Sequence, residues 1–199
     1  MPVIAARLFL PDLINRFLQA YPHIVVDVVV DNNFVDVAAG GFDAGIRYGE
    51  SLAQDVIAVP IGPRSQTYAS GASPAYLAAR GVPLHPRDLL DHACLRLKFL
   101  SGAMAPMEFE RDGQTLSVDA SGPLIVTPTA FELGIEAALA GIGVINLFEE
   151  CLQPYFDSGA LVPVLKEWWP RFGGPYLYYS GRRHVPAPLR AFIDFVQAG

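Results

Sequence analysis

Two threonines bracket a proline at the point where an apolar run gives way to a helical pattern. Thr127 and Thr129 flank Pro128, directly after residues 124–126. A Thr hydroxyl at a helix entry can accept a hydrogen bond from an unpaired backbone N–H of the first turn. In an α/β sheet the loop after a strand lies at the carboxyl edge, where ligands bind, and a helix start there favours an anion or a carbonyl. The stretch is therefore either a ligand-binding loop or a plain βαβ unit with a capped helix.

A second candidate for ligand binding follows a different predicted strand. Residues 24–30 (IVVDVVV) are too apolar for a half-exposed strand, and Asn32 and Asn33 come after them in a polar turn. Side-chain amides both donate and accept hydrogen bonds, so this pair can contact a small polar ligand. An ordinary turn is the alternative interpretation.

A cationic candidate ends the short strand predicted over residues 43–47. Arg47 can pair with an anionic ligand, because a guanidinium presents a fork of donors that matches a carboxylate. The same side chain can equally pair with Asp43 or Glu50 next to it in the sequence.

The motifs of the common enzyme and cofactor sites are absent from the sequence. There is no GxSxG nucleophile elbow, no P-loop and no HExxH, and Gly141-Ile142-Gly143 follows a helix, where it predicts a helix stop rather than a dinucleotide loop. The histidines lack metal-ligand spacing: His23, His85, His92 and His184. Cys94 and Cys151 lack CxxC partners and suggest buried thiols of a reducing compartment. We therefore expect no enzyme activity, no cofactor and no metal site.

The composition sets the class of protein. At 199 residues, with 52% hydrophobic and 17% charged residues, the chain suits one domain or two small lobes with a large core. No run approaches the length of a membrane span, and the N-terminus does not fit a signal peptide, so we expect a cytoplasmic protein. The net charge of −6 argues against DNA binding by this chain alone, because phosphate contacts require a basic face.

Hydrophobic spacing and turn residues place the elements that position these candidates. Strands and helices alternate along most of the chain, which predicts an α/β fold with largely parallel sheets covered on both faces. The predicted helices are residues 7–21, a short helix 34–39, 74–80, a helical turn at 86–90, a central helix ending at Gly141, an uncertain 148–157 and 187–197. The predicted strands are residues 24–30, 43–47, 56–61, 65–69, 94–99, 124–126, 144–147, 161–165 and 175–180, with a hairpin around Asp112-Gly113.

In their order and spacing, these elements resemble the effector-binding domain of LysR-type transcriptional regulators. The segments that carry the resemblance are LPDLINRFLQAYPHIVVDVVV, FVDVAAGGFDAGIRYG, ASPAYLAARG, the Asp112-Gly113 hairpin, AALAGIGVINL and the closing SGALVPVL and PYLYYSGRRHVPAPLRAFIDFV. Each segment alone shows only the general sequence pattern of a strand or a helix. Their order along nearly the whole chain makes the resemblance specific.

The resemblance implies two Rossmann-like lobes of periplasmic-binding-protein type with an interlobe cleft. Lobe I would hold residues 1–66 and 174–199, lobe II residues 67–173, and the family's N-terminal winged helix-turn-helix is absent from this chain. A small effector would bind in the cleft. Besides Asn32, Asn33, Arg47, Thr127 and Thr129, we expect Phe99, Ser101 and Met107 to line an apolar wall of this cleft. The resemblance adds Ile4, which it places in a first turn facing the cleft.

The function that the resemblance implies is effector sensing in a bacterial transcription regulator. The effector would be a small organic or aromatic acid, given hydroxyls, amides and an Arg around an apolar floor. Binding would shift the packing of a dimer or tetramer, with the homodimer using helix 7–21 and strand 24–30 against lobe II, and DNA would be bound only by the absent domain. The alternative is a solute-binding protein of a transport system, which has the same fold.

Overall fold

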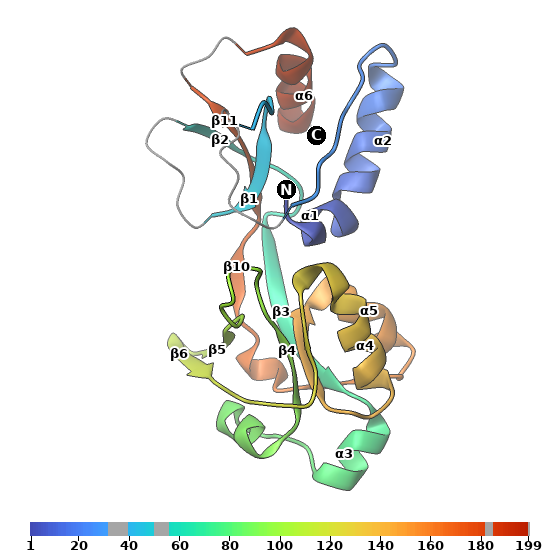
Figure 1. The fold of residues 1–199 in the computed structure, drawn as a ribbon, viewed down its shortest axis with the longest axis vertical. Coiled ribbons are helices and arrows are strands. Elements are labelled where there is room, and N and C mark those ends of the chain that lie inside the picture. The colour runs from blue at the N-terminus through green and yellow to red at the C-terminus, as the bar shows by residue number, and fades with distance from the viewer. Residues whose placement is uncertain (32–39, 50–55, 182–184, 199) are drawn as a thin grey trace. The chain divides into compact units, whose positions relative to one another are not determined.

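The computed structural model describes residues 1–31, 40–49, 56–181 and 185–198. Contacts within the chain divide it into two compact units. Unit 1 comprises Met1–Ser65 and Gly173–Gly199, and unit 2 comprises Gln66–Phe172. The chain therefore passes from unit 1 to unit 2 and back, and unit 2 is an insertion into unit 1 (Figure 1).

In the described part of unit 1, a small antiparallel sheet is combined with three helices. Its helices are α1 (Val3–Leu8), α2 (Leu10–Ala20) and α6 (Ala187–Ala198), and its strands are β1 (Gly45–Tyr48), β2 (Val56–Pro60) and β11 (Pro175–Ser180). The order is β1-β11-β2, with Ile46 opposite Leu177 and Leu177 opposite Val59. Helices α2 and α6 lie side by side in Figure 1, where the ring of Phe17 meets that of Phe192 edge-on at 4.9 Å. These apolar faces form one core with the sheet.

Unit 2 is built on a six-stranded mixed sheet. Its strands are β3 (Ser65–Ala72), β4 (Cys94–Leu97), β7 (Ile125–Val126), β8 (Val144–Phe148), β9 (Val162–Val164) and β10 (Arg171–Gly173). The order is β10-β3-β8-β4-β7, and β9 pairs with β3. Strands β7 and β8 run parallel to β4 on either side of it, whereas β3 is antiparallel to β8. Helix α4 therefore connects two strands that flank a third.

Helices and a hairpin complete unit 2. They are α3 (Pro74–Arg80), η1 (Pro86–Asp91), the hairpin β5 (Met107–Arg111) and β6 (Gln114–Val118), η2 (Pro128–Ala130), α4 (Phe131–Leu139), α5 (Glu149–Asp157) and η3 (Lys166–Trp168). The hairpin turns at Asp112 and Gly113, both with positive φ, which a tight two-residue turn requires. Helix α3 begins at Ser73, whose Oγ accepts a hydrogen bond from the N–H of Tyr76 at 3.2 Å.

Several predicted elements are confirmed where local signals are strong. The helix 74–80, the strand 175–180 and the hairpin appear as predicted, and Gly141 adopts φ 78° after α4, as the predicted helix stop requires. Residues 149–157 form α5 with Pro154 inside it.

The predicted single helix 7–21 is wrong, because it is divided at Phe9. Helix α1 ends at Leu8 and α2 begins at Leu10, with Pro11 in its first turn. Proline has no N–H to donate to the preceding turn, and its ring clashes with the carbonyl four residues earlier. A proline at this position therefore starts a helix rather than continuing one.

The predicted parallel sheets are largely wrong for the described residues. Both pairings in unit 1 are antiparallel, and in unit 2 only the pairs of β4 with β7 and with β8 are parallel among those with a described register. The prediction that residues 124–126 are buried on both faces is also wrong for Ile125, which is exposed because β7 is the edge strand.

The prediction of a strand over residues 24–30 is wrong as well. The segment forms no ladder in the described part of the chain, and Val25 and Val28–Val30 are exposed. Strand propensity alone does not make a strand, because a strand exists only beside a hydrogen-bonding neighbour.

Candidate functional site

Unit 2 gathers its candidate residues at one edge of its sheet. The parallel strands β4, β7 and β8 end at the same edge, and antiparallel β3 begins there. The segments that leave this edge are residues 98–101, 127–130 and 149–150, and Gln66 lies at the start of β3. We call this set the carboxyl edge of unit 2. Figure 1 shows α4 and α5 following directly from it.

Thr127 and Thr129 lie together at the start of the turn that leads into α4. Their hydroxyl oxygens are 2.9 Å apart, and the N–H of Ala130 donates to the carbonyl of Thr127 at 2.9 Å. Neither hydroxyl caps the helix: no side-chain cap is present at Thr127, so the capping role predicted for these residues is wrong. In a hydroxyl pair one proton is used between the two oxygens, which leaves one donor for a ligand.

The adjoining segment, after β4, supplies an apolar and a cationic side chain. Its backbone is fixed to β7 because the N–H of Lys98 donates to the carbonyl of Val126 at 2.8 Å. Phe99 is 43% exposed, and the exposed Ser101 accepts through Oγ from the N–H of Ala103 at 3.5 Å. Lys98 is exposed and was missed by sequence reasoning, although it is the second-last residue of the strand predicted over 94–99.

A buried amide completes the edge and was also missed. Gln66 donates through Nε2 to Oε1 of Glu150 at 3.1 Å, and no partner for Gln66 Oε1 is found in the described part of the chain. The two residues are far apart in the sequence and meet only because β3 and β8 are neighbours. No local pattern could have paired them.

Met107 and Ile4 both lie within apolar cores. Met107 is 3% exposed at the start of β5, in the core that contains Phe109 and Trp168. Ile4 is buried in the first turn of α1 in unit 1. Both positions account for an apolar side chain without a ligand, and a role in effector contact stays a prediction.

Arg47 lies on β1 of unit 1 and has a partner that the sequence did not indicate. Its Nε donates to the hydroxyl of Tyr178 at 3.0 Å, and its guanidinium lies 5.6 Å from the centre of that ring. Side chains on the neighbouring strands β1 and β11 thus contact each other, and the local pair of Arg47 with Asp43 stays a prediction. The described residues do not include Asn32, Asn33, Glu50 or the short helix predicted over residues 34–39.

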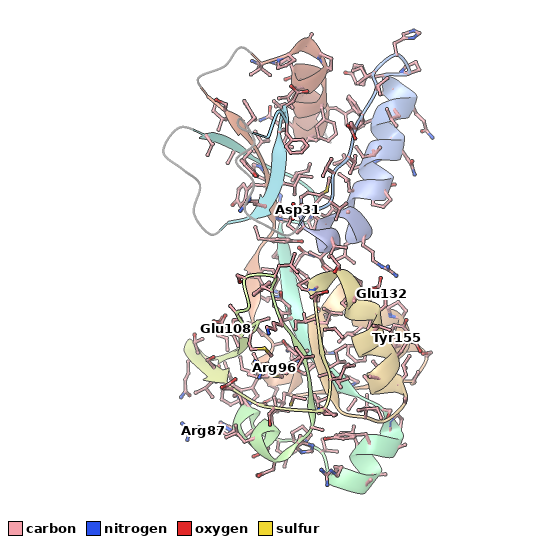
Figure 2. All side chains as sticks on the ribbon, viewed as in Figure 1. Asp31, Arg87, Arg96, Glu108, Glu132 and Tyr155 are labelled. Carbon is pink, nitrogen blue, oxygen red and sulfur yellow. The ribbon has the colours of Figure 1, made fainter. Side chains whose placement is uncertain are left out.

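A buried arginine on β4 bonds to the backbone of segments next to the carboxyl edge. Arg96 on β4 is 5% exposed, and its guanidinium donates to the carbonyls of Ala120 and, at 3.1 Å, Ala105 (Figure 2). It also contacts Oδ1 of the exposed Asp119 at 3.2 Å. These bonds fix the segment between β4 and β5, which contains Ser101, to the strand.

Among the residues that the structure describes, His, Cys, Asp and Glu form no group of three or more suited to a metal ion. Of the helices in those ranges, none has the length and apolar character that crossing a membrane requires.

Comparison with known proteins assigns the chain to a family. Residues 1–199 match the family described as LysR substrate binding domain, and the chain belongs to that family. It is 37% identical over 196 residues to the HTH-type transcriptional regulator YcaN of Escherichia coli, covering 98% of this chain and 63% of that protein. It is 32% identical over 191 residues to PgrR of E. coli, again covering 63% of the relative. The chain thus spans a little under two thirds of these curated relatives.

Solved structures show the same fold. The full-length virulence activator AphB of Vibrio cholerae, a member of the LTTR family, superposes with a TM-score of 0.81 at 25% identity, covering 99% of this chain and 65% of that one. The regulatory domain of AphB from Vibrio vulnificus gives a TM-score of 0.79, covering 98% and 93%. The expected two-lobe α/β fold of periplasmic-binding-protein type is confirmed. The family is one of regulatory domains, not a known enzyme class, and this favours a regulator over a transport protein.

Proposed function

We propose that this domain senses a small organic or aromatic acid and that the carboxyl edge of unit 2 is the part of the site that recognises the acid group. The observation that carries the proposal is the hydroxyl pair of Thr127 and Thr129, at the start of the turn that enters α4. A helix start offers unpaired N–H groups and a partial positive charge, and both favour a carboxylate.

The neighbouring side chains give this edge an amphipathic character. Exposed Lys98 supplies a positive charge one residue from the half-exposed ring of Phe99. An aromatic acid matches this combination, with its ring against Phe99 and its carboxylate toward the hydroxyls and the ammonium. The predicted contacts of Asn32, Asn33, Arg47 and Ile4 complete the proposal from unit 1, with the effector held in an interlobe cleft.

A thermal-shift screen against small carboxylates and aromatic acids tests the site. A compound at about 100 times its Kd stabilises the folded protein by about 2.7 kcal/mol, which raises the melting temperature by several degrees. We expect Thr129→Val and Lys98→Met each to weaken binding about tenfold, whereas Thr115→Val and Lys166→Met, at exposed positions of β6 and η3, leave it unchanged. If the two pairs of variants respond alike, the acid does not bind at this edge.

The regulatory part of the proposal concerns the complete protein. Effector binding would favour one lobe arrangement, change the packing of a cytoplasmic homodimer or tetramer, and so control a DNA-binding domain beyond this chain. We propose that α2 and residues 24–30 of one copy meet unit 2 of the other. The exposed face of α2 is polar, with an ion pair of 3.0 Å between Arg16 and Asp12.

Sedimentation equilibrium tests the proposed dimer contact. Asn15→Arg places a bulky charge on the exposed face of α2, and we expect it to weaken dimerisation at least tenfold. Gln197→Arg makes the same change at an exposed position of α6, in unit 1 but outside α2 and residues 24–30, and serves as the control. Equal dimer dissociation constants for the two variants would exclude α2 from the interface.

A further inference from the structure

One buried side chain at the carboxyl edge of unit 2 has an acceptor that nothing in the described chain uses. Gln66 is 2% exposed, and its Nε2 donates to Oε1 of Glu150 at 3.1 Å. A carboxylate only accepts hydrogen bonds, so this contact fixes the orientation of the amide and leaves its oxygen for another partner. That oxygen, Oε1, is buried and has no partner among the described residues. Buried acceptors are nearly always bonded, so this one indicates a donor that comes from outside the chain.

We propose that the effector carries a hydrogen-bond donor, a hydroxyl or an amino group, at the end remote from its acid group, and that Gln66 Oε1 accepts from that donor. This rests on the function proposed above, which places the acid group at Thr127, Thr129 and Lys98. It narrows the class of effector from small acids in general to acids with a distal donor.

Strand register places Gln66 and Lys98 on the same face of the sheet. Tyr68 pairs with Phe148 in the ladder of β3 and β8, and Gln66 shares a face with Tyr68 because it is two residues away. The register of β4 on β8, continued to the end of the strands, places Lys98 beside Phe148. Since β8 lies between β3 and β4, two strand spacings, about 10 Å, separate the backbones of Gln66 and Lys98. Their long side chains shorten this gap to one that a small molecule spans.

An aromatic cluster beside Gln66 supports an apolar body between the two ends of the effector. The rings of Tyr68, Phe148 and Phe172 have centroids 4.6, 5.1 and 5.5 Å apart. Phe148 is buried, whereas Tyr68 and Phe172 are partly exposed. A ring or an aliphatic chain laid against the two exposed faces gains apolar contact. We expect the effector to reach the amide of Gln66 along this surface.

The chemistry around Gln66 favours a donor over a second acid group. The unpartnered oxygen cannot donate, and the neighbouring carboxylate of Glu150 repels another carboxylate. A site whose buried group bonds a hydroxyl discriminates strongly against the analogue without it, because that group is then left unpaired. The preference for a distal donor should therefore be large enough to measure as a ratio of dissociation constants.

The experiment measures Kd by isothermal titration calorimetry for two matched series of acids. Benzoate, para-methoxybenzoate and para-hydroxybenzoate share a ring and differ only at the remote end. Hexanoate and its terminally hydroxylated form make the same comparison on a flexible chain. Ortho-hydroxybenzoate carries its donor next to the acid group and serves as the positional control.

Three variants locate the preference. Gln66→Met removes the acceptor and keeps the length of the side chain. Gln153→Met is the matched control, because it removes another amide-to-carboxylate bond of unit 2, the one to Asp157 at 2.6 Å on the exposed part of α5. Lys98→Met tests the acid group. Each readout is a ratio of two acids on one variant, so a change in the amount of folded protein does not alter it.

We expect the terminal hydroxyl to tighten binding to wild type at least about tenfold, and the methoxy and ortho-hydroxy groups to give no gain. Gln66→Met should reduce the advantage to less than about twofold, whereas Gln153→Met keeps it. Lys98→Met should weaken all acids about tenfold and leave the ratio unchanged.

Two results would overturn the distal donor while the proposed acid site stands. One is that wild type binds the acids but gains nothing from the terminal hydroxyl. The other is that Gln66→Met keeps the full advantage. If wild type binds none of the acids, the proposed function fails and the distal donor with it.

Discussion

Arg96 can stabilise unit 2 through hydrogen bonds to backbone carbonyls or through its ion pair with Asp119, and substitutions distinguish the two. Its guanidinium bonds to the carbonyls of Ala120 and Ala105 and contacts the carboxylate of Asp119. Asp119 is 97% exposed, so its ion pair is worth about 0–1 kcal/mol. Each charged hydrogen bond to a buried carbonyl is worth about 1.5–3 kcal/mol. The carbonyls should therefore dominate.

Arg96→Met keeps most of the apolar stem and removes the charge. The substitution removes two hydrogen bonds to carbonyls, which together contribute about 3–6 kcal/mol to stability. It also removes the buried Nε of Arg96, which has no partner among the described residues, and the desolvation cost of that group is therefore regained. We expect a net loss of about 2–4 kcal/mol in the free energy of unfolding of unit 2. For Asp119→Ala we expect a loss of less than about 1 kcal/mol, because the guanidinium keeps both carbonyls.

Urea denaturation followed by tryptophan fluorescence measures this directly. Both tryptophans, Trp168 and Trp169, belong to unit 2, so their emission reports on that unit alone. With a slope of about 2 kcal/mol per M, Arg96→Met should lower the midpoint by about 1–2 M and Asp119→Ala by less than about 0.5 M. Equal shifts in the two variants would show that the exposed ion pair carries the energy and would refute the reasoning.

Three further outcomes follow from single contacts. Asp88 accepts hydrogen bonds from the backbone of His85 and Leu84, which lowers its pKa; Asp88→Ala should cost about 1 kcal/mol in urea denaturation. That difference should be present above the usual carboxyl range and vanish as pH falls through the lowered pKa. Burial raises the pKa of the Cys94 thiol to about 11, so wild type should lose stability between about pH 9 and 11, a slope that Cys94→Ala abolishes. Phe17→Ala should destabilise unit 1 by about 3–5 kcal/mol, measured by calorimetry, because Phe17 is fully buried against α6.

Local chemistry made part of the fold predictable. Ser73-Pro74 fixed the start of α3 and Asp112-Gly113 fixed the hairpin, because capping and turn geometry depend on a few adjacent residues. Strand direction was not predictable in the same way. The alternation of strands and helices suggested parallel pairing, but β11 returns from unit 2 to lie between β1 and β2 and is antiparallel to both. Pairing across such a distance leaves no local pattern.

In the candidate site, too, residues with local sequence signals were predictable and contacts between distant segments were not. Thr127 and Thr129 were identifiable because the ends of strands and the starts of helices can be located from sequence. Gln66 and Glu150 were not, since their contact depends on β3 lying beside β8. Arg47 was placed correctly on a strand, but its contact with Tyr178 was not predicted, because cross-strand neighbours are invisible to sequence spacing.

The insertion of unit 2 into unit 1 imposes an order of folding during synthesis. All of unit 2 is continuous in the chain and has its own core, so it can fold as soon as it leaves the ribosome. Unit 1 cannot, because β11, the central strand of its sheet, is made only after unit 2 is complete. Until then β1 and β2 have no partner between them, and α2 lacks the face of α6 against which Phe17 is buried. The part of unit 1 that precedes unit 2 in the chain is thus made before unit 2 but reaches its final structure after it.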